Sequence, residues 1–562
     1  MPRQPRTDSA SCWERKPFAT PALDWRETMH DLLHDPLIGV RTRAGERRLS
    51  LPDLLAALSA GEVEGYTGLR AHQADPWHVF LVQLAASIQA RQPTDTLPPD
   101  PAYWREGLLD LAGGKASAWH LLVEDVTQPA FMQHPWMSWE AEAADYGVTI
   151  KRGQTSYAPK ATTPDELDVL VTSKNHDVKM ARVGAEEVEA WLYALVLLQT
   201  TSGFLGQGNY GIVRMNGGFA SRPVVAWAVS LHPSQRFQHE VAVVMQLRNS
   251  TVRTYGYAAR GVTLTWVRPW SRSDHQFQLA DLEPWFVEAA RPIRLVRSPS
   301  GHLIALGATS KARQIGPKTL ENGDVGDPWI PINTADKKKG RSAMTLSADG
   351  FTPERLTDLL FAQGFELTAL QQPQVSEGPG WFVASCLVRG QGTTEGYHEV
   401  RIPVPPKARL ALLHTGQRQT LGQLAQRLLS DAKAVQKALN TALAVLSEGG
   451  PDQADFERVE SWLKTAKRDF GRRWESLYFP TLWRGAEEEH DTVRRDWQQR
   501  LVDEAHALLD EATQRLPLPA NRTWRAITQA ERAFHGLLRK HELPFPRRAP
   551  AHTLETMEDA IP

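Results

Sequence analysis

The residues most suggestive of chemistry lie in a glycine-rich stretch between Gly203 and Gly218. A spacing found in loops that cradle nucleotide phosphates, G-x-G-x-x-G-x-V, is formed by Gly206, Gly208, Gly211 and Val213. Bulky residues separate these glycines. This arrangement is typical of a backbone that approaches another molecule closely or adopts positive φ.

The context of this spacing argues against a nucleotide site. A dinucleotide-binding loop follows a strand and opens a helix, whereas apolar residues recur at helical spacing from Ala185 to Gln199, just before the glycines. A kinase requires an H-R-D sequence, which the chain lacks. The D-F-G at Asp469-Phe470-Gly471 falls inside an amphipathic helical run. We interpret both motifs as chance matches and expect the glycine loop to act through its backbone.

Asn175-His176-Asp177 is the remaining candidate for catalysis, as a metal or nuclease site. No second histidine or acidic cluster accompanies it at ligand spacing. The two cysteines, Cys12 and Cys386, are too few for a four-thiolate zinc site. We therefore predict no catalytic residues, no metal and no cofactor. The alternative is a nucleotide-dependent or metal-dependent enzyme that acts on nucleic acid.

The composition sets limits on size, partners and compartment. At 562 residues the chain is long enough for two or more domains, and its formal net charge of -1 gives no global signal for nucleic acid. No apolar run reaches the roughly 20 residues of a membrane span, and the N-terminus lacks an apolar signal core. With two cysteines, these features predict a soluble protein in the reducing cytoplasm, without a membrane partner.

The elements that position these residues divide the chain into three parts. Residues 1–27 are polar and read as a mobile tail, and residues 28–405 read as a mixed α+β domain of short strands, helices and long loops. In this domain, Ser50 is expected to cap a helix, and Trp77 to Ile88 is expected to be helical. Strands are predicted at Val224–Ser230, Glu240–Leu247, Val262–Val267, Ile293–Val296 and Trp381–Val388.

Residues 406–562 change to a helical pattern. Four apolar stripes follow one another, starting near Leu421, Phe456, Val493 and Trp524, and glycine or proline breaks separate them. Short connections between amphipathic helices predict an antiparallel four-helix bundle. The expected fold class is therefore α+β, with a large mixed N-terminal domain followed by this C-terminal bundle.

Several segments in order resemble the large subunit (CasA) of the type I-E CRISPR Cascade complex. The glycine loop and the helical C-terminus are two of them, and the others are Asp31–Arg41, Ser50–Leu55, Pro129–Gln133, Thr163–Asp168 and Ser173–Asp177. The resemblance covers most of the chain after the tail. Some family members carry a cysteine-rich zinc element, which is missing here.

The resemblance implies a non-catalytic subunit of an RNA-guided surveillance complex. Such a subunit sits at the 5′ end of the CRISPR guide RNA and inspects double-stranded target DNA for a protospacer-adjacent motif (PAM), largely from the minor groove. A glycine loop approaches the groove edge, a basic finger reaches in, and a glutamine-bearing hairpin wedges the duplex open. The family's other partners are the small and backbone subunits of Cascade and a separate helicase-nuclease.

Carried onto this chain, the resemblance gives two loops with distinct roles. The loop for the DNA motif comprises Gly206, Gly208, Asn209, Gly211 and Asn216, for which the alternative is a packing turn. The loop for the guide-RNA handle offers Lys174, Asn175, His176 and Lys179, for which the alternative is an ordinary solvated loop.

The wedge and the basic finger are assigned from hairpin position and charge. Gln391, flanked by glycines, is the expected wedge, with a plain hairpin as the alternative. The finger is expected at Lys311 and Arg313, with Arg297 and Lys318 as rivals. The densest basic run, suited to DNA phosphates or simply solvated, includes Lys337, Lys338 and Lys339.

Overall fold

The computed structural model describes residues 29–137, 150–152, 155–170, 188–203, 208–214, 221–270, 276–298, 301–310, 314–315, 322–338, 340–375, 379–390, 394–448, 460–515 and 520–547. Within these ranges, helices alternate with small sheets that are antiparallel except for one parallel pair, so the predicted α+β class is confirmed. None of the helices in these ranges combines the length and apolar character that crossing a membrane requires.

Near the start of the described chain lies a three-stranded antiparallel sheet, with a capped helix between its second and third strands in the sequence. The strand order is β2-β1-β3, formed by β2 (Gly45–Leu49), β1 (Ile38–Thr42) and β3 (Val63–Tyr66). Helix α1 (Leu51–Ser59) begins after Ser50, whose hydroxyl accepts a hydrogen bond from the backbone N–H of Asp53 at 3.3 Å. The predicted N-cap is therefore confirmed, because a serine hydroxyl satisfies a backbone donor that the helix itself leaves free.

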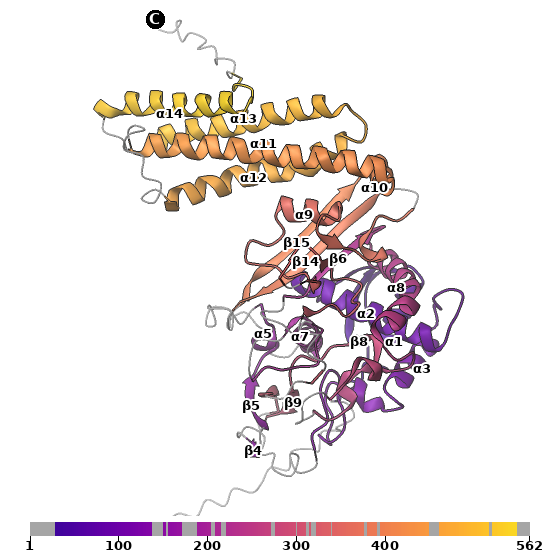
Figure 1. Cartoon of the computed structure of the whole chain (residues 1–562). Helices are drawn as coiled ribbons and strands as arrows, with labels where there is room; N and C mark the ends of the chain where they lie inside the picture. The colour runs from indigo at the N-terminus through magenta and orange to yellow at the C-terminus, as the bar shows by residue number, and fades with distance from the viewer. Residues whose placement is uncertain are drawn as a thin grey trace, which may run out of the picture.

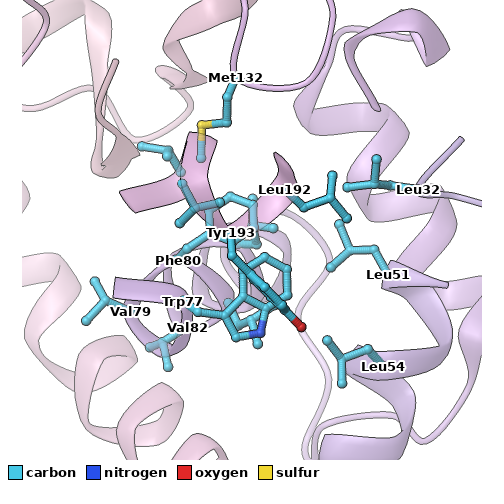
Figure 2. Close-up of a cluster of buried hydrophobic side chains, with 14 of the residues drawn as sticks. Leu32, Leu51, Leu54, Trp77, Val79, Phe80, Val82, Met132, Leu192 and Tyr193 are labelled. Atoms are coloured by element: carbon cyan, nitrogen blue, oxygen red, sulfur yellow. The ribbon is translucent and has the colours of Figure 1, made fainter. Parts of the chain in front are cut away.

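Two buried helices form the centre of the mixed region. Almost every residue of α2 (Ala71–Arg91) and α7 (Val188–Thr201) is buried, and α3 (Pro101–Leu111) packs against α2. Figure 2 shows Trp77 and Phe80 of α2 gathered with Leu192 and Tyr193 of α7. The helices predicted before the glycine loop and at Trp77–Ile88 are thus confirmed within the described ranges.

One strand prediction is wrong. Glu240–Leu247 lies inside α8 (Pro233–Tyr255), which begins with proline in its first turn and ends at Gly256 with φ 73°. Its valines suggested a strand, but Val241 and Val244 lie on the buried face, and Glu240 accepts a hydrogen bond from Arg236 one turn earlier. Packing and helix-end signals outweigh the β-propensity of these valines.

The remaining strand predictions hold wholly or in part. β6 (Pro223–Ala228), β9 (Ile293–Arg297) and β14 (Gly380–Arg389) match their expected positions. The run Val262–Val267 divides into β7 (Val262–Leu264) and a 3-10 turn, and β7 pairs in parallel with β8 (Leu282–Val287). A four-stranded sheet has the order β4-β5-β10-β9, with β4 (Ile150–Arg152), β5 (Thr155–Ala161) and β10 (Leu303–Ala308).

The sheet β15-β14-β6 joins the mixed region to the C-terminal helices. β14 forms a long hairpin with β15 (Thr394–Val404), which Figure 1 shows between the two regions. Alternate residues of β14 face opposite sides: Val383 and Leu387 belong to the core around α2, whereas Phe382 and Cys386 belong to the core of the C-terminal helices. Because side chains alternate along a strand, one strand contributes to both cores.

The C-terminal helices lie side by side and share one core (Figure 1). They are α11 (Thr415–Glu448), α12 (Glu460–Arg484), α13 (His490–Arg515) and α14 (Ala520–Lys540), and a short helix α10 (Pro406–Leu413) precedes them. Phe470, in the middle of the D-F-G sequence, is fully buried in α12. That sequence is therefore a packing feature of a helix.

Candidate nucleic-acid interface

The two ends of the glycine loop are held together by one buried guanidinium. Arg291, 8% exposed, donates from Nη2 to the carbonyl of Gly203 at 3.1 Å and from Nη1 to the carbonyl of Asn209 at 3.1 Å. A third bond from Nη1 reaches the carbonyl of Ala290 at 2.7 Å. All three acceptors are backbone carbonyls, so Arg291 closes the loop without a carboxylate.

Gln199, near the end of α7, fixes the backbone position of Arg291. Its side-chain amide donates to the carbonyls of Met132 and Arg291, each at 2.9 Å, and its side-chain oxygen accepts from the N–H of Arg291 at 2.8 Å. Further along, Ile212 and Ala289 exchange two backbone hydrogen bonds of 3.0 Å. Residues 211–214, which leave the loop, are therefore bridged to the segment just after β8 and do not form a helix.

Two glycines of the same motif meet different surroundings. Gly208 has φ 97°, and a Cβ placed on it would meet no atom within 4 Å. A Cβ on Gly211 would lie 2.3 Å from the backbone oxygen of Ala290. Gly208 thus leaves open space for another molecule, whereas Gly211 is needed for close packing inside the protein.

The glycine loop meets the start of the expected basic finger. The N–H of Ser310 donates to the carbonyl of Gly208 at 2.8 Å, and the N–H of Tyr210 donates to the carbonyl of Ser310 at 3.3 Å. The indole N–H of Trp270 donates to the Ser310 hydroxyl at 3.1 Å. Since Lys311 directly follows Ser310, the two predicted segments are neighbours in space as well as in role.

The expected wedge hairpin meets the start of the expected guide-handle loop. At the base of the hairpin, Arg389 donates from Nη1 to the carbonyl of Val169 at 3.0 Å, and the Thr394 hydroxyl donates to the same carbonyl. The N–H of Arg389 donates to the hydroxyl of Ser221 at 2.9 Å. Val169 lies just before the residues that contain Lys174, so two predicted loops begin at one point.

Three cations lie close enough to repel one another across these two junctions. Burial, and then the charge of Arg389, lower the pKa of Arg291 to about 10. Burial also lowers the pKa of Arg389, and burial followed by the charges of Arg291 and Arg389 lowers that of Lys160. Among the residues that the structure describes, none of the three forms an ion pair. The region therefore keeps a positive potential that a polyanion could neutralise.

The basic run lies on a different sheet. Lys337 and Lys338 are exposed in a turn between β11 (Ile332–Asn333) and β12 (Ser342–Ala343), where the N–H of Lys338 donates to Asp336 at 2.9 Å. Arg341, at the end of this run, is paired with Asp324 at 2.8 Å and with Glu366. The two lysines are accessible to phosphates, but the sheet β12-β11-β13, completed by β13 (Phe365–Glu366), does not anchor the loops described above.

The described residues contain Gly208, Asn209, Gly211, Lys337 and Lys338 of the predicted set. The other predicted site residues lie outside the described ranges, and they are Gly206, Asn216, Gln391, Lys311, Arg313, Lys339, Lys174, Asn175, His176 and Lys179. The structure therefore shows where four predicted segments are anchored: the glycine loop beside the basic finger, and the hairpin beside the guide-handle loop.

Sequence reasoning missed the residues that do the anchoring. Arg291, Arg389, Lys160 and Ser310 are ordinary members of strands and strand ends in the sequence. No local pattern reveals that a guanidinium will reach carbonyls more than 80 residues earlier in the chain. Such contacts are a consequence of the tertiary fold.

Comparison with solved structures identifies the fold. Over 91% of this chain, the structure resembles Cse1, a CRISPR-associated protein from Acidimicrobium ferrooxidans, with a TM-score of 0.58, 14% identity and 98% of that chain covered. CasA from Thermus thermophilus gives a TM-score of 0.61, 14% identity and 91% and 99% coverage. Cse1 from Thermobifida fusca gives 0.57, 15% identity and 91% and 97% coverage.

The resemblance predicted from the sequence is therefore confirmed at the level of the fold, which is that of CasA/Cse1 chains over nearly their whole length. No protein-family model matches the sequence. No curated protein matches it significantly either. The likeness is thus carried by the arrangement of the elements, with little sequence identity.

Proposed function

We propose that this chain is the large subunit of a type I-E CRISPR RNA-guided complex and that it recognises the protospacer-adjacent motif in double-stranded DNA from the minor groove. The observation that carries the proposal is the open glycine position Gly208, clamped by Arg291 beside unpaired cations. Minor-groove readout depends on width and close backbone approach more than on many side-chain contacts. A rigid turn without a side chain at its surface suits that task.

The hairpin and the guide-handle loop are assigned linked roles, because both begin at one anchor point. The hairpin carrying Gln391 would open the duplex beside the motif, and the segment carrying Lys174 would hold the handle of the guide RNA. Arg389 and Thr394 bind the base of the hairpin to Val169, where that segment begins. Opening of DNA next to the guide would then be coupled mechanically to the guide itself. Pairing of the guide with the target strand nearly balances the cost of separating the duplex.

The C-terminal helices serve assembly in this proposal. We infer an antiparallel four-helix bundle in residues 406–562 that contacts the small and backbone subunits and supports recruitment of the helicase-nuclease. Trp524 on α14 is 79% exposed, and exposed tryptophans are frequent anchors of protein interfaces. The chain itself has no catalytic role here: cleavage belongs to the recruited enzyme.

The test is binding of motif-containing and motif-free duplex DNA by a reconstituted guide complex that carries the Gly208→Asp variant. The new side chain adds bulk and a negative charge where DNA phosphates would pass, so motif-dependent affinity should fall at least about tenfold, or 1.4 kcal/mol. Gly113→Asp, at another glycine with positive φ and open space that lies outside the predicted DNA-binding residues, is the matched control. Equal, small losses in the two variants would refute the role of Gly208 in motif recognition.

A further inference from the structure

Two histidines and a glutamate meet on the C-terminal helices, far in sequence from the glycine loop. His506 lies on α13, and Glu531 and His535 lie one turn apart on α14. His506 Nε2 is 3.3 Å from Glu531 Oε1, and His535 Nε2 is 3.8 Å from Glu531 Oε2. One ligand atom of each residue lies within 4.8 Å of the others.

These separations suit a small tetrahedral ion. Zinc binds histidine nitrogen and carboxylate oxygen at about 2.0–2.2 Å, which places neighbouring ligand atoms roughly 3.3 Å apart. The two histidine nitrogens lie 3.3 and 3.8 Å from the two different oxygens of Glu531, and one ligand atom of each residue lies within 4.8 Å of the others, so side-chain rotations could bring one atom of each onto one ion. Two imidazoles and one carboxylate form a ligand set that borderline-soft divalent ions favour.

A second carboxylate supports this reading independently. Asp510 Oδ2 lies 3.3 Å from Nδ1 of His506, on the side of the ring opposite to Glu531. Histidines that bind metals usually donate their other ring N–H to a carboxylate or carbonyl, which fixes the ring and its tautomer. Asp510 lies where such a carboxylate partner would lie, and an N–H donated to it would leave Nε2 of His506 facing Glu531.

Aromatic neighbours restrict the orientation of the two histidine rings, and the cluster remains accessible to solvent. The rings of His506 and His535 are stacked at 12° with centroids 6.4 Å apart, and Phe545 packs edge-on against His535 at 5.4 Å. The side chains of His506 and Glu531 are each 26% exposed. An ion could enter from solvent, and a water molecule could complete a fourth position.

We propose that His506, Glu531 and His535 bind a divalent transition-metal ion, zinc by preference, which links α13 to α14. Asp510 positions His506 and does not itself contact the ion. The site is independent of DNA recognition, because its residues belong to the helical region and the glycine loop does not. Its consequence is a helical surface whose stability responds to the ion.

Calorimetric titration of Zn²⁺ into untagged, chelator-treated full-length protein tests this proposal. We expect one ion per chain at this site, with the melting temperature rising on saturation because the ion binds only the folded state. His506→Ala and His535→Ala should each remove that binding event. Asp510→Asn should keep the stoichiometry and weaken affinity by about tenfold. A purely structural ion pair would give the same melting temperature with and without Zn²⁺.

The matched control is His541→Ala, which removes an exposed histidine just beyond α14 that is not in the cluster. Circular dichroism of each variant without metal establishes that the helices are intact. Co²⁺ provides a second readout, since a tetrahedral site with nitrogen ligands gives visible absorption that Zn²⁺ should displace. Absence of binding by the wild-type protein, or binding that persists unchanged in both cluster variants with intact helices, would overturn the proposal.

Discussion

Arginines of the C-terminal helices and cations beneath the glycine loop are stabilised by different partners. In the helices, Arg473 pairs with Glu511 at 2.6 Å, Arg484 with Asp496 at 2.8 Å, and Arg494 with Asp431 at 2.8 Å. Beneath the loop, Arg291 and Arg389 are bound by backbone carbonyls and hydroxyls. These arginines of the helices are therefore neutralised by carboxylates, whereas Arg291 and Arg389 are not, although Arg214 at the exit of the loop is paired with Glu288 and Asp327.

Under the proposed function, this difference would allow one chain with a net charge of -1 to serve two kinds of partner. A neutralised helical surface offers shape and exposed apolar groups such as Trp524, which suit protein contacts. Cations that hydrogen-bond to carbonyl and hydroxyl dipoles keep their net positive charge, which suits binding to nucleic acid. Substitutions in the two regions test this division, beginning with the largest expected effect.

Arg291→Ala should be the most damaging of these single changes. It removes the clamp and leaves the carbonyls of Gly203, Asn209 and Ala290 without this donor, at a cost of about 1–3 kcal/mol for each that stays buried. We expect the free energy of unfolding to fall by about 4 kcal/mol and motif-dependent DNA binding to be lost. Urea denaturation and the duplex-binding assay measure the two effects.

The control for this change is Arg484→Ala on α12, whose partners Glu488 and Asp496 have side chains that are 41% and 54% exposed. A partly exposed ion pair contributes about 1 kcal/mol or less, and DNA affinity of the guide complex should be unaffected. If both variants lost similar stability and neither affected DNA binding, the contrast between the two regions would have no functional meaning.

Acidification should weaken the loop region through His134. Burial, and then the charge of Arg294, lower the pKa of this histidine to about 4, although its hydrogen bond to the carbonyl of Arg268 opposes the shift. An unfolded chain binds the proton near pH 6.5. Stability is therefore complete above about pH 6.5 and falls as the pH drops toward 4, by about 3 kcal/mol in total.

Urea denaturation of wild type and His134→Gln across this pH range measures the effect as a difference. The variant should lose less stability between pH 6.5 and 4, because it has no group to protonate there. Parallel curves for the two proteins would show that His134 does not account for acid sensitivity.

Substitutions of Gly208 and Gly211 should have smaller effects on stability, and they distinguish a packing role from a recognition role. Gly211→Ala forces a Cβ against the backbone of Ala290, so we expect a loss of about 2 kcal/mol in the free energy of unfolding. Gly208→Ala meets open space and costs about 1 kcal/mol, because an alanine at positive φ is strained. Thermal denaturation of both variants gives the order, and a larger loss for Gly208→Ala would contradict it.

Local sequence signals predicted those parts of the fold that are determined by residues close together in the sequence. The cap at Ser50 and the hairpin β14–β15 are both specified within a few residues. Helix α8 was missed because its valines favour a strand locally, while its burial against distant elements decides for a helix.

The site was predictable only as a set of separate loops. Glycine spacing predicts a role for both Gly208 and Gly211, but it does not reveal that Gly208 meets open space whereas Gly211 packs against Ala290. Arg291 joins carbonyls from two ends of a loop that lies more than 80 residues earlier, and no periodicity encodes such a contact. Sequence patterns report local conformation, whereas the anchoring of a site depends on long-range contacts.

Loss of a wedge residue and loss of a phosphate-contacting residue should have different effects on the binding of target DNA that is already open. This difference extends the comparison from two regions of the protein to two forms of the DNA. Gln391→Ala should weaken binding to fully paired target DNA by about tenfold, since a wedge offsets the unstacking of one base step. A target already melted beside the motif should bind almost as well as to wild type, because that cost has been removed.

Lys338→Ala should behave differently. This exposed lysine would contribute through counterion release, so its loss should weaken both targets alike and reduce the salt dependence of binding by about one ion. Affinities for the paired and melted targets at two salt concentrations distinguish the roles without any further structure. Equal losses on both targets for Gln391→Ala would remove it from the wedge role. In that case Thr393, in the same predicted hairpin, would be the next residue to change, because Arg389 and Thr394 anchor the base of that hairpin.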